Sequence, residues 1–165
     1  MNKFIFVFLF VVFSSAAFEV KLDDEHKFFF VVKKNNLDVK MTAKSIGKER
    51  SDFEVNDYIY NCELDSELSL IKTSLEKKSI GGVQTTLFAY RIGCFGDVEP
   101  IPIKYFAFQN GIKYALRGEE TIQTPNGNYG GEEEPIPGRN LKKNTILYKY
   151  MRDRWKDISL RKYYE

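Results

Sequence analysis

Residues 103–116 have the sequence IKYFAFQNGIKYAL, which predicts a β-hairpin. Asn110-Gly111 separates two runs rich in aromatic and aliphatic residues. Both central positions of a two-residue hairpin turn need positive φ angles, and Asn-Gly supplies them. Pro100 and Pro102 cannot donate ladder hydrogen bonds, so they mark the start of the first strand. This hairpin makes an antiparallel sheet the first expectation for the fold.

Further strand-like segments lie on the N-terminal side of the hairpin. They are residues 28–32, 37–43, 53–62, 68–75 and 83–90. Segment 37–43 alternates apolar and polar residues, which is the period of a half-buried strand. Segment 83–90 carries apolar side chains on both faces near its end. We therefore expect segment 83–90 to be a central strand that is covered on both sides.

The C-terminal part of the chain predicts one amphipathic helix. Leu147, Met151, Trp155 and Ile158 recur at helical spacing and form one apolar stripe. Asn144 is the expected N-cap. We expect Trp155 to pack this helix onto the sheet. The predicted fold class is α+β, a mostly antiparallel β-sheet with the helix packed on it.

Residues 124–139, TPNGNYGGEEEPIPGR, are rich in Gly, Pro and Asn and contain three consecutive glutamates, Glu132, Glu133 and Glu134. No hydrophobic period is present, so we expect a long surface loop. Loops of this length are usually functional or disordered, and both interpretations stay open. Residues 161–165 after the helix are expected to be a frayed tail.

The N-terminus has the pattern of a secretory signal peptide. Lys3 is followed by ten apolar residues, 4–13, and then by small residues up to Ala17. A membrane-spanning helix needs about 20 apolar residues, and no later run approaches that length. We expect residues 1–17 to be removed and residues 18–165 to form a single domain. The mature protein is then periplasmic or secreted, with no membrane span.

The composition narrows the possible partners. With 25 Lys and Arg against 23 Asp and Glu, the chain has no basic excess for nucleic acid or an anionic membrane surface. The single histidine, His26, leaves little room for histidine-based metal sites or catalytic triads. The cluster at residues 23–26 is interpreted as a solvated segment rather than a metal site. No metal or other cofactor is expected.

Cys62 and Cys94 are the two cysteines of the chain. In an exported protein such a pair favours a disulfide. The closed loop of about 31 residues would stabilise the fold by roughly 3–4 kcal/mol in the chain-entropy treatment. Two free buried thiols remain an alternative. A catalytic or metal-binding role is less favoured, because both need additional ligands or a nearby base.

The middle of the chain resembles a family of small exported bacterial proteins without an assigned function, some of which are labelled surface-polysaccharide biosynthesis proteins. The resemblance is carried by residues 57–65, 88–94, 96–100 and 113–119, which include the blocks YRIGCFGDVEP and KYALRGE. It extends over roughly residues 57–158.

The resemblance implies cysteines at both Cys62 and Cys94, which strengthens the disulfide prediction. The family also carries an acidic turn, similar to calcium loops, before the central strand. Here that place is occupied by KKSIGG at residues 77–82, without acidic side chains. Calcium needs about six to eight oxygen ligands, so no metal site is transferred. The family implies no catalytic residues.

The functional hypothesis is an exported binding or inhibitor protein, which could be an immunity protein against a periplasmic toxin hydrolase. An acidic loop could block the cleft of a basic enzyme. The expected partner is another protein in the periplasm, or else a glycan. The candidate partner-binding residues are Glu132, Glu133, Glu134, Tyr129, Asp97 and Arg117.

Two alternatives belong to other functional classes. The first is an accessory protein for envelope polysaccharide, suggested by the family label. The second, less favoured, is a carboxylate-based hydrolase, because glycosidases need only two suitably spaced carboxylates. Its candidate residues are Asp97, Glu99, Glu119 and Glu120, with Arg117 as a pairing cation. We expect no enzymatic activity, since ordinary surface charge explains these carboxylates as well.

Overall fold

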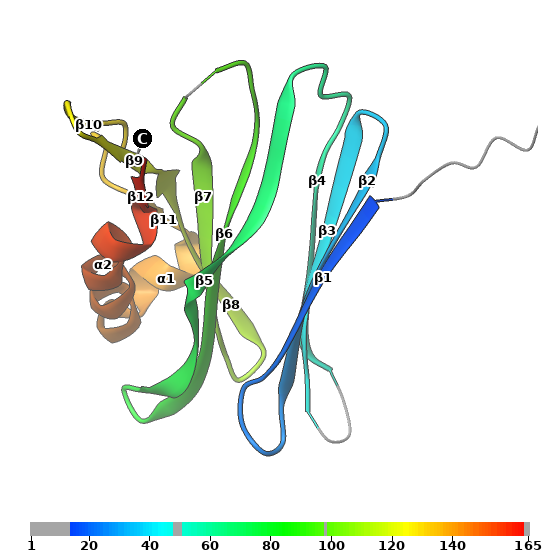
Figure 1. Cartoon of the computed structure of the whole chain (residues 1–165). Coiled ribbons are helices and arrows are strands. Elements are labelled where there is room, and N and C mark those ends of the chain that lie inside the picture. The colour runs from blue at the N-terminus through cyan, green and yellow to red at the C-terminus, as the bar shows by residue number, and fades with distance from the viewer. Residues whose placement is uncertain (1–13, 48–50, 98, 164–165) are drawn as a thin grey trace, which may run out of the picture.

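The computed structural model describes residues 14–47, 51–97 and 99–163. They form three main layers, in which a four-stranded sheet faces a five-stranded sheet and two helices cover the other side of the second sheet (Figure 1). The apolar run 4–13 of the expected signal peptide lies outside the described residues. The expected cleavage after Ala17 falls within the first strand, β1 (Ser14–Lys21).

The outer sheet is an antiparallel meander. Its strands follow the order β1, β2 (Lys27–Asn35), β3 (Asp38–Ile46) and β4 (Ser51–Ile59). The alternation predicted for residues 37–43 is confirmed from Val39 onward, because Val39, Met41 and Ala43 are buried while their neighbours are more exposed. Leu37 lies in the turn before β3 and is exposed. Each strand of this sheet therefore presents one apolar face to the core.

The central sheet has the order β11, β8, β7, β6, β5, and all its pairings are antiparallel. The predicted hairpin is present, with Asn110 and Gly111 at φ angles of 50° and 76°. In β6 six consecutive residues, 85–90, are buried, which confirms a strand covered on both faces. The bounds of these strands are β5 Asp65–Ile80, β6 Val83–Phe95, β7 Pro102–Gln109, β8 Ile112–Glu119 and β11 Ile136–Pro137.

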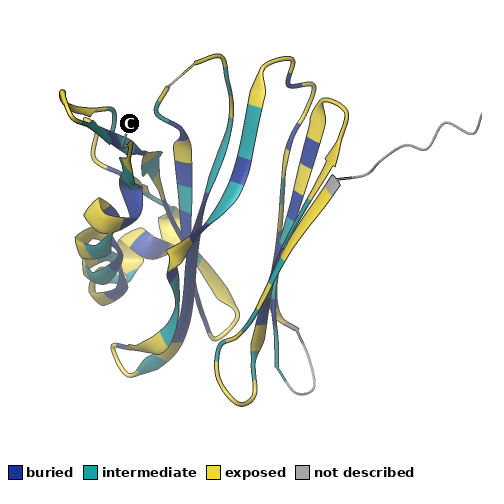
Figure 2. Ribbon diagram, in the orientation of Figure 1, coloured by how far each residue is buried: buried dark blue, intermediate teal, exposed yellow. Residues whose placement is uncertain are grey.

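Two hydrophobic cores lie on opposite faces of the central sheet (Figure 2). The core between the sheets is aromatic, with Phe53 stacked on Phe108 at 3.9 Å and Phe28 at 5.1 Å from Phe88 between ring centroids. The second core lies under helices α1 (Arg139–Lys143) and α2 (Thr145–Ser159).

Helix α2 confirms the predicted amphipathic helix. Leu147, Met151, Trp155 and Ile158 are all buried against the central sheet. The Asn144 side chain accepts a hydrogen bond from the backbone N–H of Leu147 at 3.1 Å, as expected for an N-cap. The protein is therefore an α+β fold, mostly antiparallel sheet with a C-terminal helix packed on it.

Two short regions differ from expectation. Segment 124–139 is not a loop throughout, because it contains β10 (Gly127–Tyr129) and β11. The predicted frayed tail is wrong for Arg161 and Lys162, because β12 (Leu160–Lys162) pairs in parallel with β9 (Thr121–Thr124). Strands of two to four residues carry too little hydrophobic period to be recognised, and their partners are distant in sequence.

Candidate functional site

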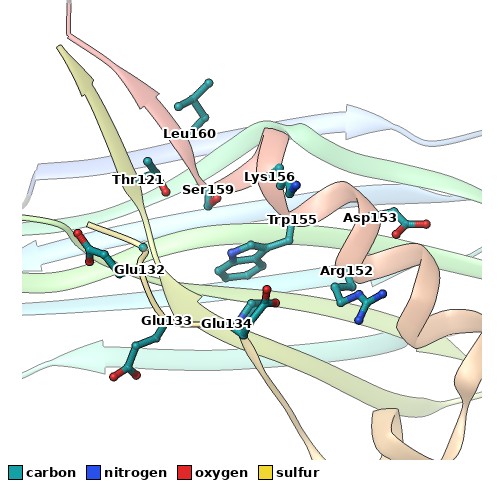
Figure 3. A pocket seen from close by; sticks show the side chains of 12 residues that line it. Thr121, Glu132, Glu133, Glu134, Arg152, Asp153, Trp155, Lys156, Ser159 and Leu160 are labelled. Carbon is teal, nitrogen blue, oxygen red and sulfur yellow. The ribbon is translucent and has the colours of Figure 1, made fainter. Parts of the chain in front are cut away.

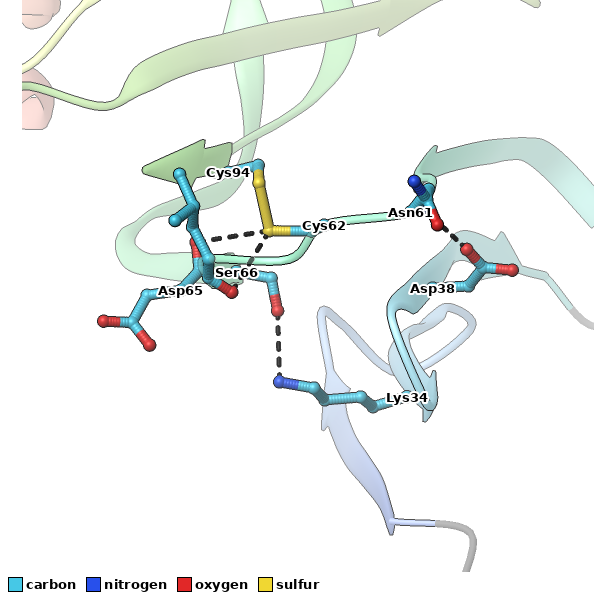
Figure 4. Close-up of a disulfide and its surroundings, with 8 residues drawn as sticks. Lys34, Asp38, Asn61, Cys62, Asp65, Ser66 and Cys94 are labelled. Atoms are coloured by element: carbon cyan, nitrogen blue, oxygen red, sulfur yellow. Dashed lines mark hydrogen bonds between the residues drawn. A yellow bond between two sulfur atoms is a disulfide. The ribbon is translucent and has the colours of Figure 1, made fainter. Parts of the chain in front are cut away.

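The predicted disulfide joins Cys62 and Cys94, whose Cα atoms are 5.7 Å apart (Figure 4). It ties the β4–β5 connection to the end of β6. The same connection is held to the β2–β3 turn, because the Cys62 N–H donates to the Leu37 carbonyl at 2.9 Å and the Asn61 N–H donates to the Asp38 carboxylate at 2.9 Å. The disulfide is thus part of the link between the two sheets.

The three glutamates of the predicted binding loop stand on a fixed backbone. Gly130 and Gly131 have φ angles of 77° and 67°, and a Cβ at either position would collide with Pro100 or Thr121. The Gly130 N–H donates to Glu132 Oε1 at 2.9 Å. Only glycine fits this turn without strain.

The other end of the segment is equally anchored. Pro135 is buried, and β11 pairs with Leu116 and Arg117 of β8. The Gly138 N–H then donates to the Ala115 carbonyl at 2.8 Å. The backbone that carries Glu132–Glu134 is therefore attached to the central sheet on both sides.

A pocket of about 740 Å³ lies between this segment and the C-terminal half of α2 (Figure 3). We call it the acidic groove. Trp155 is 7% exposed and packs on Gly118, where a Cβ would lie 2.7 Å from the indole Cζ2 atom. The residues lining the groove are Thr121, Gly131, Glu132, Glu133, Glu134, Pro135, Arg152, Asp153, Trp155, Lys156, Ser159 and Leu160.

The charges that face the acidic groove are largely uncompensated. Glu133 and Glu134 are exposed, and no residue in the described part of the chain forms an ion pair with either. On the helix, Arg152 lies over the Tyr148 ring, 5.9 Å from its centroid. Asp153 is the exception, because its bond to Lys149 at 2.8 Å lowers the pKa of its carboxyl group. Charges of both signs are therefore available to a ligand.

The remaining predicted binding residues lie outside the acidic groove. Arg117 is exposed, and its guanidinium lies 5.8 Å from the ring centroid of Phe106, which belongs to the core between the two sheets. Asp97 lies in the β6–β7 connection, where its carbonyl accepts from the Glu99 N–H at 2.8 Å. Tyr129 lies on β10 opposite Ile122. The structure thus brings together the three glutamates and separates them from the other candidates.

Glu120, one of the carboxylates considered for hydrolysis, is buried in an ion-pair network. Its Oε2 atom lies 2.7 Å from Arg91 Nε, and its Oε1 atom lies 3.4 Å from Arg161 and accepts from the Ile101 N–H. Burial disfavours the charge of Arg161, but Glu67 and Glu120 outweigh it and raise the pKa of the guanidinium. Glu120 is fully shielded from solvent, so this network joins strands and does not present a carboxylate to substrate.

The segment 23–26, which was expected to be solvated, forms a polar cluster with Lys77, and this contact was not predicted. The His26 Nδ1 atom lies 2.8 Å from Asp23 and 2.7 Å from Lys77 Nζ. Hydrogen bonds from Lys77 and His26 hold the pKa of Asp23 well below its ordinary value. The cluster adjoins a pocket of about 450 Å³ at one end of the sheet sandwich. Lys77 lies 51 residues from His26, so no local pattern could indicate the contact.

No combination of three or more His, Cys, Asp or Glu within the described ranges could hold a metal ion. Among the helices of the same residues, none is long and apolar enough to cross a membrane. No protein-family model, curated protein or solved structure matches this chain.

Proposed function

We propose that this protein is an exported binding protein of the inhibitor type, which uses the acidic groove to bind a basic surface of another protein. The observation that carries the proposal is the pair of exposed, uncompensated glutamates, Glu133 and Glu134, on a backbone anchored at both ends. A charged segment with no internal partner is available for an external one.

Anchoring matters because binding normally costs conformational entropy. Ordering a flexible loop opposes association, whereas a loop already held in one conformation avoids much of this cost. Acidic side chains on such a loop also attract a basic partner during diffusion and accelerate association. Both properties suit a segment that enters the cleft of an enzyme.

Export is supported by two features. The pattern at residues 1–17 is typical of secretory signal peptides, and the Cys62–Cys94 disulfide is typical of oxidising compartments. An immunity protein against a toxin hydrolase in the periplasm fits these features.

The test has two steps, which are capture of the partner by cross-linking and measurement of its binding to matched charge-reversal variants. We expect a photo-cross-linker placed at Glu133 to trap a basic envelope protein, which then binds the purified wild-type chain. Replacing Glu133 and Glu134 together by Lys should weaken this binding at least roughly tenfold, mainly through slower association. Binding rates are measured by surface plasmon resonance at several salt concentrations.

The control variant replaces Glu63 and Glu99 together by Lys. Both are exposed and lie outside the acidic groove, and the change in net charge is the same. Equal weakening by both double variants would show that only net charge matters, and the proposal would then be wrong. Binding of envelope glycan in place of any protein would also contradict it.

A further inference from the structure

We infer that the acidic groove receives a peptide segment in which a basic and an acidic side chain lie close together. This inference rests on the proposed function and specifies what the partner must present. It is carried by two observations, the unsatisfied polar groups at the base of the groove and the opposite charges on its walls.

The first observation concerns Trp155 and Ser159, which are 7% and 3% exposed and both line the groove. Within the described residues, nothing accepts a hydrogen bond from the Trp155 indole N–H, and nothing bonds to the Ser159 hydroxyl. A helical serine commonly bonds to the carbonyl four residues earlier, and Ser159 does not. The only polar side-chain atom of the described chain that is both fully shielded and unbonded is the Tyr105 hydroxyl. The Trp155 and Ser159 groups are therefore open to the groove.

The chemistry of these two groups indicates the backbone of a peptide. The indole N–H is only a donor and needs an acceptor, whereas the serine hydroxyl can donate or accept. A peptide offers one carbonyl acceptor and one N–H donor per residue, so neighbouring peptide groups satisfy both side chains. Figure 3 shows the indole ring facing the acidic segment, between the two walls of the groove.

The second observation is the charge of the two walls. Glu133 and Glu134 stand on one wall, and Arg152 and Lys156 stand on the other. Within the described residues, neither Lys156 nor Arg152 forms an ion pair, and Arg152 lies over the Tyr148 ring. A purely basic segment meets repulsion from the helix, and a purely acidic one meets repulsion from the glutamates. A segment with both charges pairs with both walls.

The volume of the acidic groove is large enough for a side chain and part of the backbone of a peptide ligand. The groove encloses about 740 Å³, within the range of roughly 300–1,000 Å³ that is usual for ligand sites. The basic side chain of the ligand would lie towards Glu133 and Glu134. The acidic side chain would lie towards Arg152 and Lys156.

The test uses the fluorescence of the single tryptophan of the chain, Trp155. Three acetylated and amidated glycine pentapeptides are titrated into the purified full protein. One carries Arg at its second and Glu at its fourth position, one carries Arg at both, and one carries Glu at both. We expect saturable change in emission with the mixed peptide, and at least roughly tenfold weaker binding of the other two. The indole N–H resonance of Trp155 should shift with the same dissociation constant.

Substitutions on one wall at a time measure the contribution of each wall to peptide binding. Replacing Glu133 and Glu134 together by Gln, or Lys156→Gln alone, should each weaken the mixed peptide several-fold, whereas Glu63→Gln should have no effect. All these positions are exposed, and circular dichroism verifies folding of each variant. Equal affinity for all three peptides, or no response of Trp155 to any, would overturn the inference. If partner capture still depends on Glu133 and Glu134 in that case, the proposed function stands without it.

Discussion

At the scale of single residues, close packing and charge pairing lead us to expect that several positions tolerate few substitutions. Gly118 of β8 faces the Trp155 ring, and Asp57 of β4 reaches Tyr90 and Lys104 on the central sheet. Each contact joins segments distant in the sequence. Each also gives a prediction that can be measured on the purified protein.

Gly118→Ala should destabilise the fold. The new Cβ would lie 2.7 Å from the Trp155 ring and 3.3 Å from Pro135, and neither a packed indole nor a backbone atom moves easily. Overpacking of this kind costs about 1–3 kcal/mol. The free energy of unfolding in urea measures it. Gly96→Ala is the control, because the nearest atom there is Leu64 Cδ1 at 3.6 Å and the change should be small.

Asp57 should make stability depend on acid pH. Burial favours its neutral form, but bonds from Lys104 and Tyr90 outweigh burial, so the pKa of Asp57 is lower in the folded protein than its ordinary value. The stabilisation is complete above the ordinary pKa and is lost as the pH falls through the lowered one. Asp57→Asn should therefore reduce the difference in unfolding free energy between pH 7 and pH 3.

The matched control for Asp57 is Asp65→Asn, since Asp65 is exposed. Urea titrations of the three proteins at both pH values give the comparison. If Asp57→Asn has the same pH dependence of the unfolding free energy as the wild type, the ionised Asp57 contributes nothing to the loss of stability in acid. A similar change in Asp65→Asn would point to general charge effects instead.

At the scale of elements, the strongest local patterns predicted the structure well. Asn110-Gly111 indicated the β7–β8 hairpin, and the stripe from Leu147 to Ile158 indicated α2. These elements are formed by contacts between near neighbours in the sequence. The disulfide was also predicted, because the chain has two cysteines and an export pattern.

The elements that were missed depend on distant partners. β12 is a three-residue strand whose parallel partner, β9, lies about forty residues earlier in the sequence. Such a short strand shows no alternating hydrophobic pattern from which it could be predicted. Glu120 is buried where Arg91 and Arg161, both distant in sequence, converge on it. The acidic groove has the same origin, since its two walls meet only in the folded chain. Sequence patterns located the glutamates but not Trp155 and Ser159 beside them.

Arg161→Ala should loosen β12 without unfolding the protein. The substitution removes the bonds of Arg161 to Glu67 and Glu120, and these hold the strand that follows α2. Hydrogen exchange should accelerate in β9 and β12 and stay unchanged in the β6–β7 pair. Lys162→Ala, an exposed position on the same strand, is the control. If β9 and β12 exchange equally slowly in both variants, the ion pairs of Arg161 have no role in holding β12.

At the scale of the whole molecule, the disulfide joins the β4–β5 connection to the end of β6, next to the aromatic core. Replacing Cys62 and Cys94 together by Ser should lower the free energy of unfolding by about 2–5 kcal/mol. Urea denaturation of the double variant and of the oxidised wild type measures this difference. Wild-type protein unfolded with a reducing agent should match the variant. Equal stability in all three samples would show that the cross-link adds nothing.

The central sheet carries both cores on the same strands. In β6, Phe88 belongs to the aromatic core and its neighbour Ala89 belongs to the core under the helices. Neither outer layer can detach without exposing apolar surface on the strands that support the other. The whole molecule should consequently unfold in one thermal transition, with equal calorimetric and van't Hoff enthalpies. The acidic groove and the core between the two sheets should be lost at the same temperature.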